Sequence, residues 1–213
     1  MATSTTERLG LLGGTFDPVH IGHLVVAVSA RAALGLDRVL LVVANQPWQK
    51  SDRRLTPAED RLAMVQAAVE GRVGLEASRI EIDRGGDTYT ADTLEELADE
   101  DPDRELFLIV GSDVAAELDT WQRPDVVARL ATLAVVGRGR AHDGATRPVG
   151  HDAKPRDPSD LGLHPQWRVH RVDVPPLAIS SSDLRERHRG GLPLDFLVPD
   201  PVIALIRRRG LYS

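Results

Sequence analysis

Short apolar runs alternate with helical patterns along most of the chain, and this alternation restricts the fold more than any other feature of the sequence. Several runs are unbroken stretches of Leu, Ile and Val, which is typical of strands buried on both faces of a parallel sheet. We predict strands over residues 9–12, 38–43, 79–82, 105–110, 133–136 and 167–174. Strands that alternate with helices predict a doubly wound, Rossmann-like α/β sheet, which binds ligands at the carboxyl ends of its strands where the strand order reverses.

The ends of several helices are marked in the sequence. The first helix is predicted to begin near His20 and to bury one apolar stripe, formed by Ile21, Leu24, Val25 and Val28. The second is predicted to have Thr56 as its N-cap, Pro57 in its first turn and a capping box closed by Glu59. Gly71 is predicted to end it.

The 213 residues fit a single domain, residues 1–213, with one long loop and a small C-terminal helical part. The loop covers residues 138–165, which are rich in Gly, Pro, Asp and Arg and lack apolar periodicity, so we expect a surface segment with freedom to move. The helical part covers residues 179–213. Its last helix is predicted to run from Asp200 to Gly210 with an apolar stripe facing inward.

Composition and charge narrow the classes of protein. The chain has no cysteine, which excludes disulfides, thiolate metal sites and a cysteine nucleophile. The formal net charge of −6 argues against a nucleic-acid partner. Apolar runs are too short to cross a bilayer, and residues 1–8 lack the apolar segment of a signal peptide, so we expect a cytoplasmic protein without a membrane partner. The sequence leaves open whether the protein forms a homo-oligomer.

The strongest local signal is the string GGTFDPVHIGHL of residues 13–24, directly after the first predicted strand. Glycines let a phosphate approach the backbone closely, and the start of the following helix offers free N–H groups and partial positive charge. His20 and His23 share the first turn, so both imidazoles can donate hydrogen bonds to phosphate oxygens as charge builds in a transition state. A glycine turn followed by two surface histidines is the plain alternative.

A second string, ISSSDLR, covers residues 179–185. Its serines enter a predicted helix that closes at Gly190 and Gly191. Hydroxyl groups and free N–H groups at a helix start can hold the outer phosphates of a nucleotide, with Arg185 as the opposite charge. Ordinary capping of the helix by Ser180 or Ser181 is the alternative.

The two strings resemble the (H/T)xGH and ISSxxxR motifs of the nucleotidyltransferase superfamily. The resemblance implies the nucleotidyltransferase fold, ATP bound between two helix starts, Mg²⁺ accompanying the triphosphate, and direct in-line transfer without a covalent enzyme intermediate. It implies an ATP site that contains Gly13, Gly14, Thr15, Phe16, Asp17, Gly22, Gly111, Asp113, Ile179, Ser180, Ser181 and Ser182. It implies four catalytic residues, His20, His23, Lys50 and Arg185, and no residue is assigned as a metal ligand.

The string DTYTADTL of residues 87–94 resembles a segment of bacterial nicotinate mononucleotide adenylyltransferases, as do shorter strings at residues 59–64 and 210–212. This resemblance implies nicotinic acid mononucleotide as the acceptor, framed by Thr88, Tyr89, Thr90 and Trp121. Thr90 is placed to cap a helix over residues 91–98, whose first N–H groups suit a carboxylate better than a neutral carboxamide. Trp121 suits stacking on the pyridine ring, and a core tryptophan is the alternative.

We therefore expect transfer of the adenylyl group of ATP to the 5′-phosphate of nicotinic acid mononucleotide, giving deamido-NAD and pyrophosphate. Nicotinamide mononucleotide stays open as acceptor.

Other families are weaker alternatives. Phosphopantetheine adenylyltransferases share both motifs but generally have Thr where His20 stands, and cytidylyltransferases replace the serine motif with a different one. A tRNA-charging fragment shares the string HIGH of residues 20–23 but needs a KMSKS-like loop and an anticodon-binding domain. A non-catalytic nucleotide sensor on the same fold would bind ATP without turnover.

Overall fold

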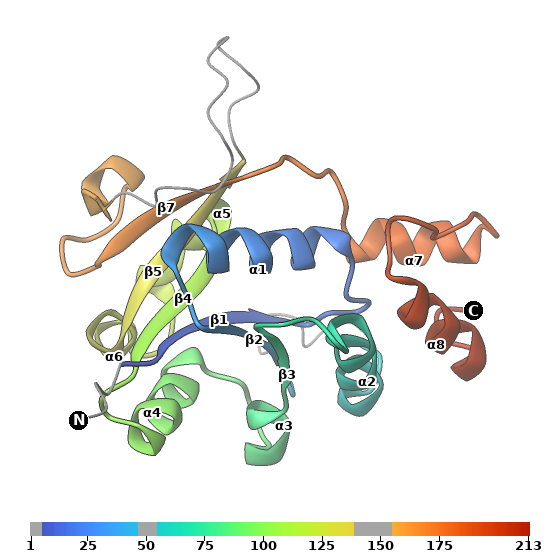
Figure 1. Ribbon diagram of the computed structural model, residues 1–213, viewed down its shortest axis with the longest axis horizontal. Helices are drawn as coiled ribbons and strands as arrows, with labels where there is room; N and C mark the ends of the chain where they lie inside the picture. Colours follow the sequence, from blue (N-terminus) through green and yellow to red (C-terminus); the bar gives the residue numbers. More distant parts are fainter. Residues whose placement is uncertain (1–5, 47–54, 139–154) are drawn as a thin grey trace, which may run out of the picture.

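A computed structural model describes residues 6–46, 55–138 and 155–213. These residues form a seven-stranded sheet in the order β3-β2-β1-β4-β5-β7-β6 (Figure 1). The strands are β1 (Arg8–Gly14), β2 (Arg38–Val43), β3 (Leu75–Ser78), β4 (Glu105–Gly111), β5 (Ala131–Arg138), β6 (Pro155–Arg156) and β7 (Val169–Val174). All neighbouring pairs are parallel except β6 and β7. The order reverses between β1 and β4, which confirms the predicted doubly wound sheet.

Helices cover both faces of the sheet (Figure 1). One face packs against α1 (Ile21–Leu34), α2 (Ala58–Val69), α7 (Ser181–Arg189) and α8 (Asp200–Arg209). The other packs against α4 (Thr90–Glu100), α5 (Ser112–Ala115) and α6 (Pro124–Leu130), while α3 (Ile80–Arg84) follows β3. Two 3-10 turns complete the described elements, η2 (Leu118–Thr120) and η3 (Pro158–Leu161).

Strand side chains alternate between these two cores. Leu106 and Leu108 of β4 face the α4 side, whereas Phe107 and Ile109 face the α1 side, and all four are at most 4% exposed. Burial on both faces explains why the central strands are unbroken apolar runs rather than alternating ones. None of the helices in the described ranges is long and apolar enough to cross a membrane.

The strand predicted over residues 79–82 is wrong. The edge strand β3 lies just before it, and residues from Ile80 onward form helix α3. The helix buries Glu81, whose carboxylate accepts a hydrogen bond from Thr93 of α4. Because this contact is made with a residue twelve positions away, the local β-rich composition did not reveal it.

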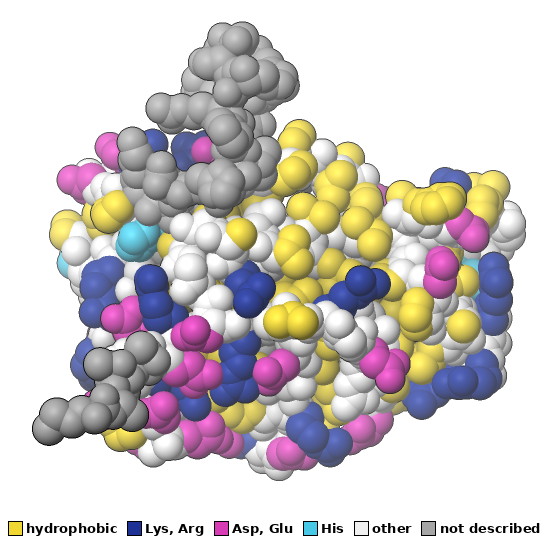
Figure 2. All heavy atoms as spheres, in the orientation of Figure 1, with side chains coloured by type: hydrophobic (Ala, Val, Ile, Leu, Met, Phe, Trp, Pro, Cys, Tyr) yellow, Lys and Arg dark blue, Asp and Glu magenta, His cyan; other side chains and the backbone are white. Residues whose placement is uncertain are grey.

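Two details of the predicted helices also differ. Helix α2 starts at Ala58, and its N-cap is Pro57 rather than Thr56, so it has no side-chain cap because proline carries no side-chain acceptor. The backbone of Thr56 is bound by Asp17 and Arg61. In α1 the buried residues are Ala27, Ala30 and Leu34, with Leu24 packed against them. Val28 is 48% exposed, and Figure 2 shows hydrophobic side chains gathered on the surface over α1. By contrast, α8 begins and ends as predicted, with Gly210 in a left-handed conformation.

The segment predicted as a loop over residues 138–165 is only partly irregular where it is described. Residues from Pro155 pair with β7 in an antiparallel register, and η3 follows with an N-cap from Asp157. Leu163 then packs into the core at 5% exposure. Residues 139–154 lie outside the described part of the chain.

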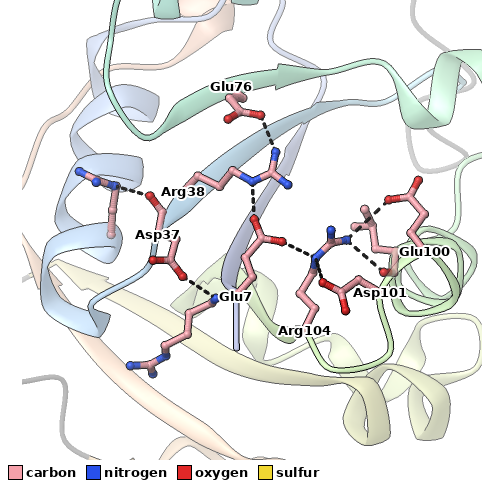
Figure 3. Close-up of polar contacts among 10 residues, drawn as sticks. Glu7, Asp37, Arg38, Glu76, Glu100, Asp101 and Arg104 are labelled. Carbon is pink, nitrogen blue, oxygen red and sulfur yellow. Dashed lines mark hydrogen bonds and ion pairs between the residues drawn. The ribbon is translucent and has the colours of Figure 1, made fainter. Parts of the chain in front are cut away.

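Charged side chains join the amino ends of β1, β2 and β4 (Figure 3). Glu7 lies at the centre of this network. One of its oxygens accepts from Arg38 Nε at 2.6 Å, and the other accepts from Arg104 Nε at 2.6 Å. Arg38 also donates to Glu76 at 2.7 Å. The hydrogen bond from Arg38, together with the one from Arg104, holds the pKa of Glu7 below its usual value in spite of partial burial.

Replacing Glu7 by Gln should lower the free energy of unfolding at pH 7 by about 1–2 kcal/mol, because two charge-assisted hydrogen bonds are weakened. Since the native pKa is lowered, this stabilisation is present above the ordinary value of 4.5 and is lost as the pH falls through the native value. The difference between the two proteins should therefore shrink in acid. Urea unfolding of both proteins at pH 7 and at a pH below 4.5 measures this difference.

Glu105→Gln is the matched control, because Glu105 pairs with Arg8 at 3.2 Å in a more exposed position. This variant should lower the free energy of unfolding by less than about 0.5 kcal/mol. Equal losses for the two variants would contradict a central role for Glu7.

Candidate active site

A cavity of about 320 Å³ opens at the carboxyl ends of β1 and β4, where the strand order reverses. Eight predicted site residues line it: Gly13, Gly14, Thr15, Thr88, Tyr89, Thr90, Gly111 and Trp121. Its remaining lining residues are Leu12, Ala44, Glu81, Leu108, Ile109, Val110, Val114 and Gln122. The cavity therefore joins the predicted phosphate loop to the predicted acceptor segment.

The two glycines of the loop serve different purposes. A Cβ added to Gly13 would meet nothing within 4 Å, so this position leaves open space for a ligand. A Cβ on Gly14 would lie 2.9 Å from the ring of Phe16, which is buried at 1% exposure in a left-handed conformation with φ of 51°. The predicted ATP contact of Phe16 can thus involve only its backbone, because its side chain belongs to the core.

His20 and His23 lie together at the start of α1, with stacked rings whose centroids are 3.7 Å apart. The backbone N–H of His20 donates to Nδ1 of His23 at 3.2 Å, so the proton of the neutral His23 ring sits on Nε2. His20 is 6% exposed, and burial lowers its pKa to about 4. Both imidazoles are therefore placed together, and His20 is uncharged at neutral pH.

The second predicted motif meets the first, across more than 160 residues of sequence. Ser181 at the start of α7 donates to the carbonyl of Pro18 at 2.9 Å. Arg185 donates to the carbonyl of Asp17 at 2.6 Å and to the hydroxyl of Ser182 at 3.2 Å. Ser180 caps α7 by accepting from the N–H of Asp183, as the capping alternative expects. Ile179 directly precedes this cap and packs against the core.

Gly22 belongs to the first turn of α1, close to the ring of His20: an added Cβ would lie 3.0 Å from two of its atoms. At the end of β4, an added Cβ on Gly111 would lie 2.5 Å from a carboxylate oxygen of Asp113, so this glycine makes room for that exposed carboxylate. Lys50 lies outside the described residues.

The acceptor segment enters α4 at the cavity wall. Helix α4 begins at Thr90 with Tyr89 as its N-cap and no side-chain cap, so the predicted cap by Thr90 is wrong. The hydroxyl of Thr88 instead accepts from the N–H of Asn45 at 3.1 Å, which ties this segment to the end of β2. Trp121 packs against the core and lines the cavity, and its buried Nε1 has no hydrogen-bond partner among the described residues.

Arg61 is a site residue that the sequence reasoning missed. It is 1% exposed and donates to four backbone carbonyls, those of Thr15 (3.0 Å), Ala44 (2.7 Å), Asn45 (3.0 Å) and Thr56 (2.8 Å). These carbonyls belong to the segments that follow β1 and β2 and precede α2. The sequence did indicate that Arg61 faces inward, because it stands three residues before Met64 and four before Val65, which are buried on the inner face of the same helix.

Glu81 was also missed, because its segment was predicted as a strand. It lines the cavity at 6% exposure, and burial raises its pKa, while the hydrogen bond from Thr93 acts in the opposite direction. Within the described residues, no group of three His, Asp or Glu side chains is arranged to hold a metal ion.

The buried neutral His20 predicts a pH-dependent stability. The unfolded state binds a proton near pH 6.5 and the native state only near pH 4, so stabilisation is complete above pH 6.5 and declines as the pH falls toward 4. Between pH 7 and pH 5 this group should lower the free energy of unfolding by about 2 kcal/mol. His20→Asn should remove that part of the decline. Urea unfolding at pH 7 and pH 5 measures it, and the same slope in both proteins would contradict the burial of a neutral imidazole.

Known proteins are similar to this chain in sequence. A family model described as cytidylyltransferase-like matches residues 11–187. A relative from Corynebacterium kroppenstedtii, named "probable nicotinate-nucleotide adenylyltransferase", is 44% identical over 213 residues, which cover 100% of this chain and 94% of the relative. A relative of the same name from Frankia casuarinae is 45% identical over 202 residues, which cover 95% and 98%.

A solved structure shares the fold. Plasmodium falciparum nicotinic acid mononucleotide adenylyltransferase complexed with NaAD superposes with a TM-score of 0.74, covering 97% of both chains at 18% identity. The same protein complexed with APC gives a TM-score of 0.69. With the sequence matches extending over nearly the whole chain, the chain belongs to the cytidylyltransferase-like family and, within it, to the nicotinate-nucleotide adenylyltransferases.

Proposed function

We propose that the chain transfers the adenylyl group of ATP directly to the 5′-phosphate of nicotinic acid mononucleotide, giving deamido-NAD and pyrophosphate in NAD synthesis. The observation that supports this mechanism most is the meeting of two helix starts. Ser181 and Arg185 of α7 bind the backbone of residues 17–18 ahead of α1, and these residues directly follow the loop of residues 13–15 that lines the cavity. Residues 1–213 act in this proposal as one nucleotidyltransferase domain.

In the proposed reaction an oxygen of the acceptor 5′-phosphate forms a bond to the α-phosphorus of ATP. The bond from that phosphorus to the bridging oxygen breaks on the opposite side, and pyrophosphate leaves. The attacking phosphate is already largely ionised at neutral pH, so the step needs positioning and charge stabilisation rather than a general base. Gly13, Gly14, Thr15, the Phe16 backbone and Gly22 form the loop side of the proposed ATP site, and Gly111 with Asp113 forms its β4 side.

His20 and His23 stabilise the phosphate oxygens as charge builds. The low pKa of His20 makes it a neutral donor, and the hydrogen bond on Nδ1 of His23 directs its ring proton to Nε2. Arg185, with Lys50 from outside the described residues, holds the leaving pyrophosphate. Only two of the five N–H groups of Arg185 are used in its bonds to Asp17 and Ser182.

Ser181 and Ser182 anchor the outer phosphates through the start of α7. The bonds that their hydroxyl groups make to Pro18 and Arg185 fix the position of this helix start relative to α1.

Mg²⁺ accompanies the triphosphate in this proposal. The exposed Asp113 carboxylate offers oxygen ligands of the type that this ion accepts directly or through water. ATP is a cytoplasmic substrate, which supports the expectation of a cytoplasmic enzyme.

The nicotinate ring is proposed to lie between Trp121 and the segment that contains Thr88, Tyr89 and Thr90. All four residues line the cavity, and the N–H groups at the start of α4 favour a carboxylate over a neutral carboxamide. Glu81 lines the same cavity, and burial raises the pKa of its carboxyl group.

Pyrophosphate release from ATP and Mg²⁺ tests the function, with nicotinate mononucleotide, nicotinamide mononucleotide and phosphopantetheine compared as acceptors. Fastest turnover with the nicotinate form supports both the reaction and the acceptor site. Turnover only with another acceptor keeps the transfer chemistry and rejects the acceptor site. ATP binding without turnover supports the sensor alternative.

His23→Ala should lower turnover by about a hundredfold or more, roughly 3 kcal/mol of transition-state stabilisation, because one donor to the phosphate oxygens is removed. Initial rates at saturating ATP and acceptor measure this. His164→Ala is the control, because His164 is exposed and lies in the turn before β7. A His23→Ala variant that turns over as fast as this control rejects the assignment.

A further inference from the structure

The C-terminal string Gly210-Leu211-Tyr212 has no part in the chemistry proposed above, yet it is held in an unusual conformation. Gly210 ends α8 with φ of 60°, and Tyr212 has φ of 68°. The left-handed region is unfavourable for a bulky side chain and persists only where surrounding contacts impose it. The tail is therefore fixed by specific contacts rather than left as a free end.

The main contact of this tail is made with Asp17, in the turn between β1 and α1. The hydroxyl of Tyr212 donates to Oδ1 of Asp17 at 2.7 Å and lies 3.7 Å from the sulfur of Met64. Asp17 is 4% exposed, and its other oxygen accepts from the N–H of Thr56 at 3.4 Å. Burial and the Asp17 carboxylate both raise the pKa of Tyr212, which keeps the phenol protonated as the donor.

Asp17 is the residue on which the contacts of the proposed active site converge. Its carbonyl accepts from Arg185, and the carbonyl of the next residue, Pro18, accepts from Ser181. Three residues after Asp17, His20 is the N-cap of α1 and stacks on His23. The side chain of Asp17 binds the C-terminal tail while its carbonyl binds the second motif, so the tail holds this segment through a contact of its own.

We propose that Tyr212 is a positioning residue for adenylyl transfer, which holds Asp17 and through it the segment that carries His20 and sets the approach of Arg185. This inference rests on the proposed function of that same site. Without the phenol hydroxyl, Oδ1 of a buried carboxylate loses its donor, and the segment can restore hydration only by moving. A small displacement of imidazoles aimed at developing charge lowers the rate of the chemical step more than it lowers substrate binding.

Tyr212→Phe tests this, because it keeps the ring and removes only the hydroxyl. We expect kcat to fall by about tenfold while the KM values for ATP and nicotinate mononucleotide each change by less than about twofold. Asp17→Ala should lower kcat at least as much, and the double variant should be no slower than Asp17→Ala alone, because both changes remove the same contact.

Two controls separate positioning from general stability. Ile203→Val trims a buried apolar side chain of α8 that cannot hydrogen-bond to Asp17. Ser213→Ala changes the same tail at an exposed residue whose hydroxyl donates to the carbonyl of Gly210. Both should keep kcat within about twofold of the parent, even if Ile203→Val lowers the melting temperature as much as Tyr212→Phe.

A Tyr212→Phe variant with the kcat of the parent, or additive losses in the double variant, overturns the inference. An equal loss of kcat in Ile203→Val also overturns it, because loss of stability would then be the cause. The parent alone tests the proposed function: if it does not turn over nicotinate mononucleotide with ATP, that function fails. The ratio between variant and parent tests only the role of Tyr212.

Discussion

A single buried guanidinium holds together the loops that carry the candidate active site. Arg61 is almost fully buried and donates hydrogen bonds to backbone carbonyls of three segments. One segment follows β1, one follows β2, and one precedes α2. Loops that converge at the carboxyl end of a parallel sheet have carbonyl groups without strand partners, and a planar five-donor group satisfies several of them at once. Burial opposes the charge of Arg61 and lowers its pKa, while Asp17 nearby favours that charge.

Around this group the site is assembled from segments that are far apart in the sequence. Asp17 receives Tyr212 on its side chain and Arg185 on its carbonyl, so the end of the chain and the second motif meet at the turn between β1 and α1. The opposite end of the sheet is joined by the ion network around Glu7. Charge is thus neutralised by pairing at the amino ends of the strands, whereas the cavity end keeps a neutral His20 and a carboxyl group, Glu81, whose pKa is raised.

Much of the fold and of the site could be predicted because its signals are local. Unbroken apolar runs identified β1, β2 and β4, and the limits of α8 followed from Asp200–Pro201 and Gly210. The predicted pairing of residues 13–24 with residues 179–185 agrees with the contacts of Ser181 and Arg185. The failures have different causes. The segment predicted as a strand at residues 79–82 forms α3, whose buried Glu81 binds Thr93 of the distant helix α4. Thr90 does not cap α4, because the helix already begins at Thr90 and its N-cap is Tyr89.

The sequence by itself determined the alternation of strands and helices, the absence of thiol chemistry and the two motifs at residues 13–24 and 179–185, since each depends on residue type and short spacing. Only the tertiary structure decided that Arg61 and Glu81 are buried at the site, that His20 is neutral, and that Tyr212 reaches Asp17. Burial and long-range hydrogen bonds depend on which distant segments surround a side chain. That arrangement exists only after the sheet has brought the carboxyl ends of β1 and β4 side by side.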